Sequence, residues 1–441
     1  MGDLRHPAPE RAILVGLDLK SRRTPGAQPV SSAEESLEEL AELARSAGAE
    51  VAGRFVQARL ALDAATLIGS GKVRELSAAA RSLGAPTVIF DHDLTPTQQR
   101  NLEDALEAKV LDRTQLILDI FAARARTREG RLQVELAQLS YLLPRLTGRG
   151  VEMSRLGGGI GTRGPGETQL ETDRRRIARR IRKIRGDLEG VRAGRALHRR
   201  KRQAVPLATV ALVGYTNAGK STLFNRLTQA GVLADARMFA TLDPTVRVLT
   251  LPSRRRVLVS DTVGFIRNLP TTLVEAFRAT LEEVAEADLV LHVVDATSSH
   301  ADAQTAHVLK VLHEIGAADL PQLLVLNKVD RLEEPGTTLA SLRGRLIGSG
   351  GPEKPVRVVA VSALTGLHLD DLRSAMDDVL PFDPLVRASF RFPIQEAGLI
   401  SLVHDGGRVL DTRYEPGYCE MEAEVSESLM RRLSAYSTVR R

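Results

Sequence analysis

Short apolar runs alternate with amphipathic segments through the first part of the chain. The runs expected to form strands are residues 12–15, 51–56, 86–90 and 109–111. Segments with a helical spacing of apolar residues lie between them, at residues 33–47, 72–83 and 95–106. Strands that alternate with helices are typical of an α/β fold with a mostly parallel sheet. The pattern therefore predicts a small α/β domain over residues 1–122.

A different pattern follows over residues 123–202, where apolar side chains recur every three or four residues. The first stripe consists of Leu132, Leu136, Leu139, Leu143 and Leu146. The second consists of Leu170, Ile177, Ile181, Ile184, Leu188 and Val191. Each stripe predicts a helix with one apolar side, and a glycine-rich tip at about 150–167 joins the two, so we expect an antiparallel hairpin. A capping box of Thr168 and Glu171 predicts where the second helix begins.

The apolar run at residues 207–213 leads directly into a loop with two glycines, a lysine and a serine. The loop consists of Gly214, Tyr215, Thr216, Asn217, Ala218, Gly219, Lys220 and Ser221. An amphipathic segment follows, which gives the strand, loop and helix order of a phosphate-binding loop. In such a loop the glycines let backbone amides surround an anion, the lysine supplies charge, and the serine hydroxyl binds Mg²⁺. The loop therefore predicts a nucleoside triphosphate with Mg²⁺ as its ligand.

The residues after the next strand-like run suit the metal and the terminal phosphate of such a nucleotide. The run at 256–260 is followed by Asp261, Thr262, Val263 and Gly264. A carboxylate at a strand end can hold Mg²⁺ through water, and a glycine amide can meet a γ-phosphate. We therefore expect Asp261 near the metal and Gly264 near the phosphate.

Two later segments concern the base of the nucleotide. They are Asn327, Lys328, Val329 and Asp330 after the run at 323–326, and Ser362, Ala363 and Leu364 after the run at 356–361. The Asp330 carboxylate can accept hydrogen bonds from the N1–H and 2-amino groups of guanine, which adenine does not offer, while the Lys328 stem can cover the ring. A backbone amide of the later segment can bind guanine O6. Because each motif stands at the end of a strand-like run, the order favours GTP and GDP over ATP.

Between the loop and Asp261 lies a segment that can respond to the bound nucleotide. It consists of Phe239, Ala240, Thr241, Leu242 and Asp243, followed by Pro244 and Thr245. A threonine that contacts both Mg²⁺ and the γ-phosphate becomes ordered with GTP and is released after hydrolysis. We choose Thr241 as that residue, with Thr245 as the second candidate. A plain turn residue ahead of a proline is the alternative.

These patterns together predict an α/β multidomain chain. The small α/β domain and the helical hairpin precede a P-loop GTPase domain at 203–383, built on a six-stranded mostly parallel sheet, and a small C-terminal α/β domain at 384–441 follows. The last domain is expected to contain strands at 388–392, 408–414 and 419–425 and a helix at 399–404. A chain of 441 residues is long enough for about three domains with cores of their own.

Basic residues are concentrated in the predicted hairpin. Between Arg124 and Arg202 there are 22 Lys and Arg against 8 Asp and Glu, a balance of +14, so the rest of the chain sums to −8 within the net charge of +6. Such a block indicates a polyanionic partner, of which RNA is the commonest in the cytosol, although a solvated helix face has the same composition. The candidate RNA contacts are Arg155, Arg163, Arg174, Arg175, Arg176, Arg179 and Arg180. Tyr141 is the sole aromatic residue here, which favours recognition of phosphate and shape over base stacking.

Composition indicates the cellular compartment in which the chain acts. A hydrophobic content of 43% is typical of a globular protein, and the single cysteine, Cys419, suits a reducing cytosol. No run approaches the ~18 apolar residues of a membrane span, and the start lacks the apolar core of a signal peptide. We expect a cytoplasmic monomer without stable membrane insertion, and peripheral association with a membrane stays open.

Two N-terminal motifs suggest sites that their context does not favour. Residues 69–72 resemble part of a phosphate loop but lack its full spacing, which favours a turn capping the next helix over a second nucleotide site. Asp91, His92 and Asp93 stand beside Thr95, and this favours a solvated loop and a helix cap over a metal site.

The motifs also carry a resemblance to a known family. The segment at 239–245 with 261–265 is similar to the Obg–HflX group of translation-factor-class GTPases, and the glycine-rich stretch and arginines of 157–176 resemble the HflX type. Residues 68–73 and 112–114 are similar to the same family. The resemblance implies that the partner is the large ribosomal subunit with its rRNA, that the hairpin enters near the peptidyl-transferase region, and that the factor splits or rescues stalled ribosomes.

One position departs from the pattern of many switch GTPases. Phe265 stands after Gly264 where those proteins carry a glutamine that orients the attacking water, so intrinsic hydrolysis is expected to be slow and stimulated by the partner. Asn217 resembles the asparagine of K⁺-activated GTPases, which helps to hold K⁺ against the phosphates. An asparagine that only shapes the loop is the alternative.

A second class of function stays open at this point. The chain can also be interpreted as a GTP-gated regulatory protein whose basic region recognises an acidic protein or a membrane surface. Use of ATP to remodel RNA is a third interpretation, which Asp330 disfavours.

Overall fold

The computed structural model describes residues 9–19, 33–146, 165–202, 207–229, 238–267, 281, 283–348, 357–380 and 383–438. The chain forms two units, of which the first consists of Met1–Leu188 with Asp235–Leu242 and Asn268–Ala276, and the second of the remaining residues. Among the described helices, none combines the length and apolar character needed to cross a bilayer.

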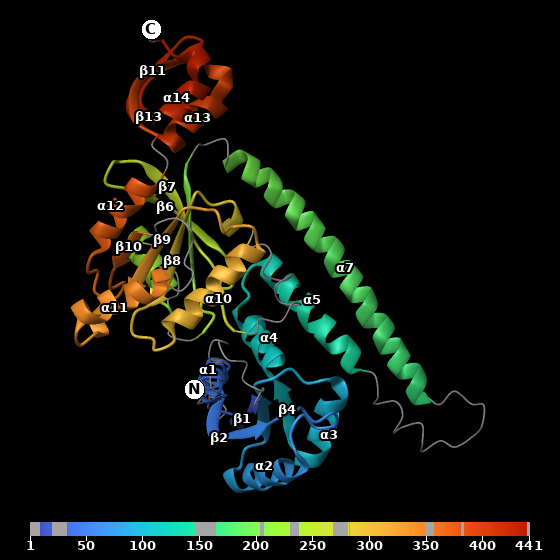
Figure 1. Cartoon of the computed structure of the whole chain (residues 1–441). Coiled ribbons are helices and arrows are strands. Elements are labelled where there is room, and N and C mark those ends of the chain that lie inside the picture. The colour runs from blue at the N-terminus through green and yellow to red at the C-terminus, as the bar shows by residue number, and fades with distance from the viewer. Residues whose placement is uncertain are drawn as a thin grey trace, which may run out of the picture. The chain divides into compact units, whose positions relative to one another are not determined.

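A four-stranded parallel sheet forms the centre of the first unit (Figure 1). Its strands are β1 (Arg11–Leu19), β2 (Glu50–Arg59), β3 (Thr87–Phe90) and β4 (Lys109–Asp112), in the order β2-β1-β3-β4. Helices α2 (Ser70–Leu83) and α3 (Pro96–Leu106) pack together on one face, and α1 (Ala33–Ser46) and α4 (Arg113–Arg124) pack together on the other. Because both faces are covered, β1 is buried almost throughout. The predicted α/β fold is confirmed, although the sequence interpretation did not include α4.

The hairpin consists of α5 (Arg128–Arg145) and the long α7 (Pro165–Arg202), which lie side by side in Figure 1. The Arg180 guanidinium donates to both carboxylate oxygens of Glu135 at 2.6 and 2.7 Å. Ile181, Ile184 and Leu188 of the predicted stripe are buried. On α5 the buried positions are instead Gly130, Gln133, Val134 and Ala137, and the predicted leucines are half-buried.

The predicted start of the second hairpin helix is wrong. The helix α7 already begins at Pro165, so Thr168 lies inside its first turns and does not precede them. Proline suits a first helical position because its missing N–H would have no partner within the helix there. Arg155 and Arg163, two of the candidate RNA contacts, lie outside the described residues.

The two N-terminal motifs, at residues 69–72 and 91–93, form structural contacts within the first unit. Gly69 is the residue before α2, and its amide donates to Gln57 Oε1 at 3.0 Å. Asp91 is buried and accepts a hydrogen bond from Arg113 at 2.7 Å, so the expectation of a solvated loop is wrong for this residue. Asp93 is exposed, and Thr95 caps α3 as expected. Among the described residues, no group of three metal-binding side chains is present.

The second unit contains the six-stranded sheet that the sequence predicts. Its strands are β5 (Thr209–Gly214), β6 (Thr245–Thr250), β7 (Arg256–Asp261), β8 (Leu289–Asp295), β9 (Gln322–Asn327) and β10 (Arg357–Ala360), in the order β10-β9-β8-β5-β7-β6. All neighbours are parallel except β6 and β7. Helices α8 (Lys220–Thr228) and α12 (Leu369–Val379) cover one face, and α10 (Ala301–Glu314) and α11 (Pro335–Gly348) cover the other. The mostly parallel order places the carboxyl ends of β5, β7, β8, β9 and β10 along one edge.

A three-stranded antiparallel sheet ends the chain. Its strands β11 (Leu385–Pro393), β12 (Gly407–Glu415) and β13 (Tyr418–Ser426) stand in the order β11-β13-β12. The helices α13 (Ala397–Gly406) and α14 (Glu427–Arg432) contribute to its core, which includes Phe390, Cys419 and Leu429. The small C-terminal α/β fold is confirmed, and α14 was absent from the prediction.

Candidate nucleotide site

The loop after β5 has a backbone that only glycine can follow at two positions. Gly214 has φ +150°, and a Cβ there would stand 2.2 Å from the Val293 carbonyl oxygen. Gly219 has φ +92°, and its Cβ would stand 2.3 Å from Asn327 Nδ2. Because no side chain fits either space, the loop can curve tightly between β5 and α8. Its backbone then leads into the N-terminus of α8, a place that favours anions.

Lys220 holds this loop from the inside. Its Nζ donates to the carbonyl oxygens of Gly214 at 3.1 Å and Tyr215 at 3.0 Å. The side chain is 6% exposed, and burial lowers the pKa of the ammonium group to about 8. A phosphate beside it would favour the charged form, so triphosphate binding and protonation of Lys220 reinforce each other.

The hydroxyl of Ser221 and the carboxylate of Asp261 lie together at the start of α8. Ser221 Oγ donates to Asp261 Oδ2 at 2.7 Å, and Asp261 is completely buried at the end of β7. A hydroxyl and a carboxylate are oxygen donors of the kind that Mg²⁺ prefers. The oxygen atoms of these two residues therefore suit Mg²⁺, which is the metal that phosphate-binding loops of this type use.

The segment from Asp261 to Phe265 lies directly against the loop. Thr216 donates its amide to the Phe265 carbonyl at 2.8 Å, and Phe265 donates its own to the Gly214 carbonyl at 3.1 Å. A Cβ on Gly264 would stand 2.8 Å from Thr216 Cα and 3.0 Å from Lys220 Nζ. The buried Thr262 hydroxyl donates to the Leu212 carbonyl at 2.5 Å, so this side chain has a structural role.

Asn327 connects three of the predicted segments. Its Nδ2 donates to the Ala218 carbonyl at 2.8 Å, and its Oδ1 accepts the Ala363 amide at 2.9 Å. The phosphate loop, the end of β9 and the segment after β10 are therefore joined through one buried amide side chain. Asp330 is exposed beside this junction, and no described residue donates a hydrogen bond to its carboxylate.

Two residues that the sequence interpretation missed support the base-binding segments. Asp295, at the end of β8, pairs with Lys328 Nζ at 2.7 Å. Arg226, on α8, donates to the carbonyl oxygens of Leu364 at 2.7 Å and Ala363 at 3.4 Å. A signal for Asp295 existed, since it ends a strand at the same edge as the other motifs. Nothing in the local sequence marks Arg226.

The nucleotide-responsive segment is divided between the two units. Phe239 to Leu242 belong to the first unit, where the Phe239 ring lies edge-on to Phe121 with centroids 4.6 Å apart. The Met238 amide donates to Ser46 Oγ at 2.9 Å. Thr245, the second candidate for sensing the nucleotide, begins β6 of the second unit.

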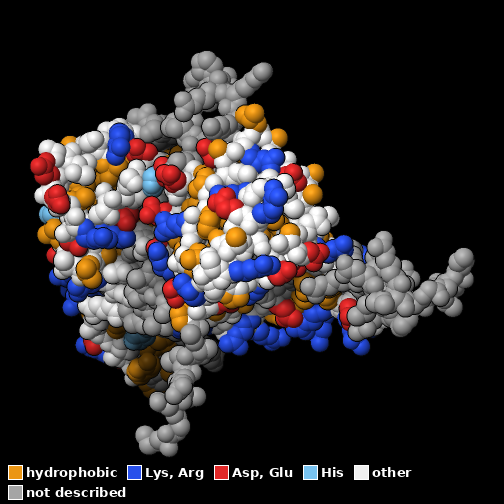
Figure 2. Space-filling model, turned by 90° about the horizontal axis from the view of Figure 1, so that it is seen from below, with side chains coloured by type: hydrophobic (Ala, Val, Ile, Leu, Met, Phe, Trp, Pro, Cys, Tyr) orange, Lys and Arg blue, Asp and Glu red, His pale blue; other side chains and the backbone are white. Residues whose placement is uncertain are grey.

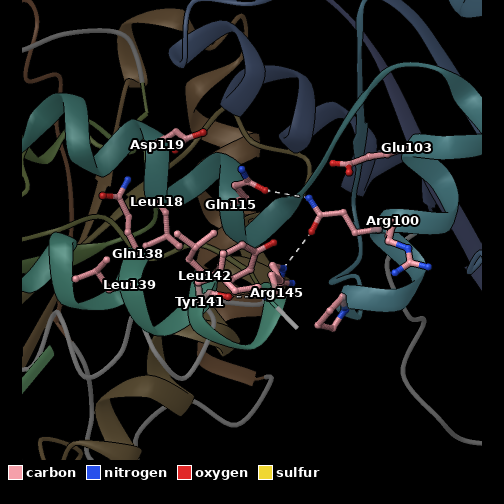
Figure 3. A pocket seen from close by; sticks show the side chains of 13 residues that line it. Arg100, Glu103, Gln115, Leu118, Asp119, Gln138, Leu139, Tyr141, Leu142 and Arg145 are labelled. Atoms are coloured by element: carbon pink, nitrogen blue, oxygen red, sulfur yellow. Dashed lines mark hydrogen bonds between the residues drawn. The ribbon is translucent and has the colours of Figure 1, made fainter. Parts of the chain in front are cut away.

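A cavity of about 410 Å³ lies elsewhere, between α3, α4 and α5 of the first unit (Figure 3). Arg145 stacks on the Tyr141 ring at 3.4 Å and donates to Asp112 and Gln99, each at 3.1 Å. None of the predicted nucleotide-binding residues lines it. The side chains of Arg145, Asp112 and Gln99 are therefore already bonded to one another.

The fold and the arrangement of motifs define a GTPase of the P-loop class, and comparison with known proteins gives its family. Family models match residues 34–122 and 124–202 (N-terminal and middle regions of GTP-binding GTPases), 209–328 (50S ribosome-binding GTPase) and 275–382 (elongation factor Tu GTP-binding domain). The chain is 47% identical to GTPase HflX of Caldanaerobacter subterraneus over 96% of its length and 93% of the relative's. It is 45% identical to GTPase HflX of Escherichia coli over 90% of its length and 89% of the relative's. The chain belongs to the HflX family of GTPases, and it binds and hydrolyses GTP.

Proposed function

We propose that this GTPase binds the large ribosomal subunit in its GTP form and separates or rescues stalled ribosomes in the cytoplasm. GTP and Mg²⁺ occupy the site formed by the phosphate loop, Asp261 and the base-binding segments, and the basic hairpin contacts rRNA. The subunit stimulates hydrolysis, after which the factor is released. The observation that carries the proposal is the row of cationic side chains along α7.

The cations of α7 whose side chains are described fall into two groups, those with a carboxylate partner, among them Arg180, and those without one. Arg175 pairs with Glu171, and Arg176 with Asp173 at 3.6 Å. By contrast, Arg174, Arg179, Arg182, Lys183 and Arg185 form no ion pair with the described residues. Figure 2 shows acidic and basic side chains mixed over most of one face, with Lys and Arg gathered along its lower margin. Cations without a carboxylate partner are the ones that gain most from a phosphate backbone.

The chemistry of hydrolysis fits a requirement for the partner. Phe265 is buried, its backbone is bonded to the loop, and its ring has no group that can orient water. A Cβ on Gly264 would stand 3.0 Å from Lys220 Nζ, so this segment lies beside the lysine that a γ-phosphate would approach. Contact with the ribosome would then stabilise this segment and position the water.

Co-sedimentation tests the proposal. The full chain should pellet with purified large subunits in a non-hydrolysable GTP analogue and remain in the supernatant with GDP, and raised salt should weaken the first result. The GTPase rate should rise when large subunits are added. Equal rates with and without subunits, together with absence from the pellet in either nucleotide, would contradict ribosome binding and favour an acidic protein or a membrane surface as the partner.

Two matched double variants test the RNA contacts. Replacing Arg174 and Arg179 with alanine should weaken subunit binding and lower the slope of log affinity against log salt by roughly 0.7 to 0.9 for each lost contact. Replacing Arg175 and Arg176 removes the same charge, but each of these arginines already pairs with a carboxylate, so we expect a smaller loss. Basal GTPase activity should stay unchanged in both. Equal losses in the two variants would mean that net charge alone drives the association.

Potassium dependence is the expected signature of Asn217. This residue is exposed in the loop with φ +61°, and no described residue bonds its side chain. If its amide oxygen helps to hold K⁺ against the phosphates, then replacing K⁺ by Na⁺ at constant ionic strength should slow hydrolysis. Asparagine also tolerates this left-handed backbone well, so an unchanged rate would leave it only a loop-shaping role.

A further inference from the structure

The segment from Ser362 to Gly366 forms a tight turn in which most backbone amides already have acceptors. Thr365 donates to Ser362 Oγ at 3.1 Å, and Gly366 donates to the Ser362 carbonyl at 2.9 Å. Ala363 donates to Asn327 Oδ1. The Leu364 amide has no acceptor among the described residues, and its side chain is 68% exposed. This amide is therefore the donor that the turn leaves for a ligand.

The direction of that amide depends on the peptide bond before it. The Ala363 carbonyl and the Leu364 N–H belong to one planar trans peptide, so they point in opposite directions. Arg226 donates to the Ala363 carbonyl through Nε at 3.4 Å and to the Leu364 carbonyl through Nη2 at 2.7 Å. A planar guanidinium with donors in a fixed fork can bond two successive carbonyls, which a single ammonium group cannot do as well.

Arg226 also stands on a rigid support. It lies on α8, the helix that begins at Lys220, so the anchor of the turn and the phosphate loop share one helix. Asn327 joins the same two segments from the other direction through Ala218 and Ala363. The base-binding turn is thus fixed on both sides.

We propose that Arg226 is a positioning residue for guanine recognition, which holds the Ala363–Leu364 peptide so that the Leu364 amide faces guanine O6. The proposal rests on the proposed guanine site at Asp330 and Ser362 to Leu364. Asp330 reads the N1–H and 2-amino side of the base, whereas Arg226 acts through the turn on the O6 side.

Binding of three diphosphates to the full chain separates these two sides. GDP and 6-thio-GDP differ at the O6 position, and GDP and IDP differ in the 2-amino group. Arg226→Met keeps the stem of the side chain but removes its donors. It should weaken GDP binding by roughly fivefold, the value of one neutral hydrogen bond from the backbone amide to O6. It should also reduce the preference for GDP over 6-thio-GDP while leaving the preference for GDP over IDP unchanged.

Two further variants complete the experiment. Arg226→Lys should restore part of the preference, and Lys310→Met, which removes a charge from an exposed site on α10, should change neither ratio. The proposal is overturned if Arg226→Met weakens all three ligands equally, or if the wild-type protein does not distinguish GDP from 6-thio-GDP. Failure of the guanine site itself would appear separately, as a preference for GDP over IDP that persists in Asp330→Ala.

Discussion

Replacing Asp330 with asparagine is expected to change the nucleotide that the enzyme prefers from GTP to XTP. The carboxylate is exposed at the end of the β9 motif with no described donor bonded to it, so both of its oxygens are available to the base. Guanine offers two N–H groups to this carboxylate, whereas xanthine has a carbonyl in place of the 2-amino group. An asparagine amide can donate to that carbonyl and accept from N1–H, which reverses the match.

The expected loss for GTP is large because two bonds to a charged acceptor disappear. At ~1.5 to 3 kcal/mol each, their removal weakens GTP binding by about two to four orders of magnitude. Competition binding of GDP and XDP, together with GTPase and XTPase rates, measures the change. Glu333→Gln, an equal charge change at an exposed position nearby, is the control. An Asp330→Asn enzyme with full GTP selectivity would contradict the base-reading role.

The site could be predicted from the sequence where its residues are consecutive. The phosphate loop, Asp261 to Gly264 and Asn327 to Asp330 are short motifs at strand ends, and the parallel sheet brings strand ends to one edge. The sequence did not indicate Arg226 and Asp295, because each is a single residue whose contact lies far along the chain. Their roles depend on the folded geometry.

The same difference, between local sequence patterns and contacts that form only on folding, explains which parts of the fold were not predicted. Helix α4 is buried on nearly all sides, with Leu116, Ile117, Leu118 and Phe121 all in the interior, so it shows no amphipathic period. Among the basic residues of α7, the pairing of Arg175 with Glu171 follows from a spacing of four residues. The pairing of Arg180 with Glu135 crosses 45 residues, and no local pattern indicates it.

The second large effect is expected at Arg113, which is 2% exposed in the first unit. Its guanidinium bonds Asp91 at 2.7 Å and Glu39 at 2.9 Å, and Asp91 also accepts from Ser36 Oγ at 2.5 Å. These contacts join α1, the end of β3 and the start of α4. Burial opposes the charged form of Arg113, but the two carboxylates outweigh it and raise the pKa of the guanidinium above its ordinary value.

Arg113→Met should therefore destabilise the first unit by about 3 to 5 kcal/mol, because it removes the buried guanidinium that bonds both carboxylates. Urea unfolding of the full chain measures the shift of its transition, and retained GDP binding shows that the nucleotide site is intact. The control is Arg81→Met, which breaks an exposed pair with Glu107 at 2.9 Å and should cost less than about 1 kcal/mol. If Arg113→Met costs no more than Arg81→Met, the buried ion pairs do not hold this unit together. Arg113→Lys should fall between the two, because one ammonium group cannot bridge both carboxylates with the geometry of a guanidinium.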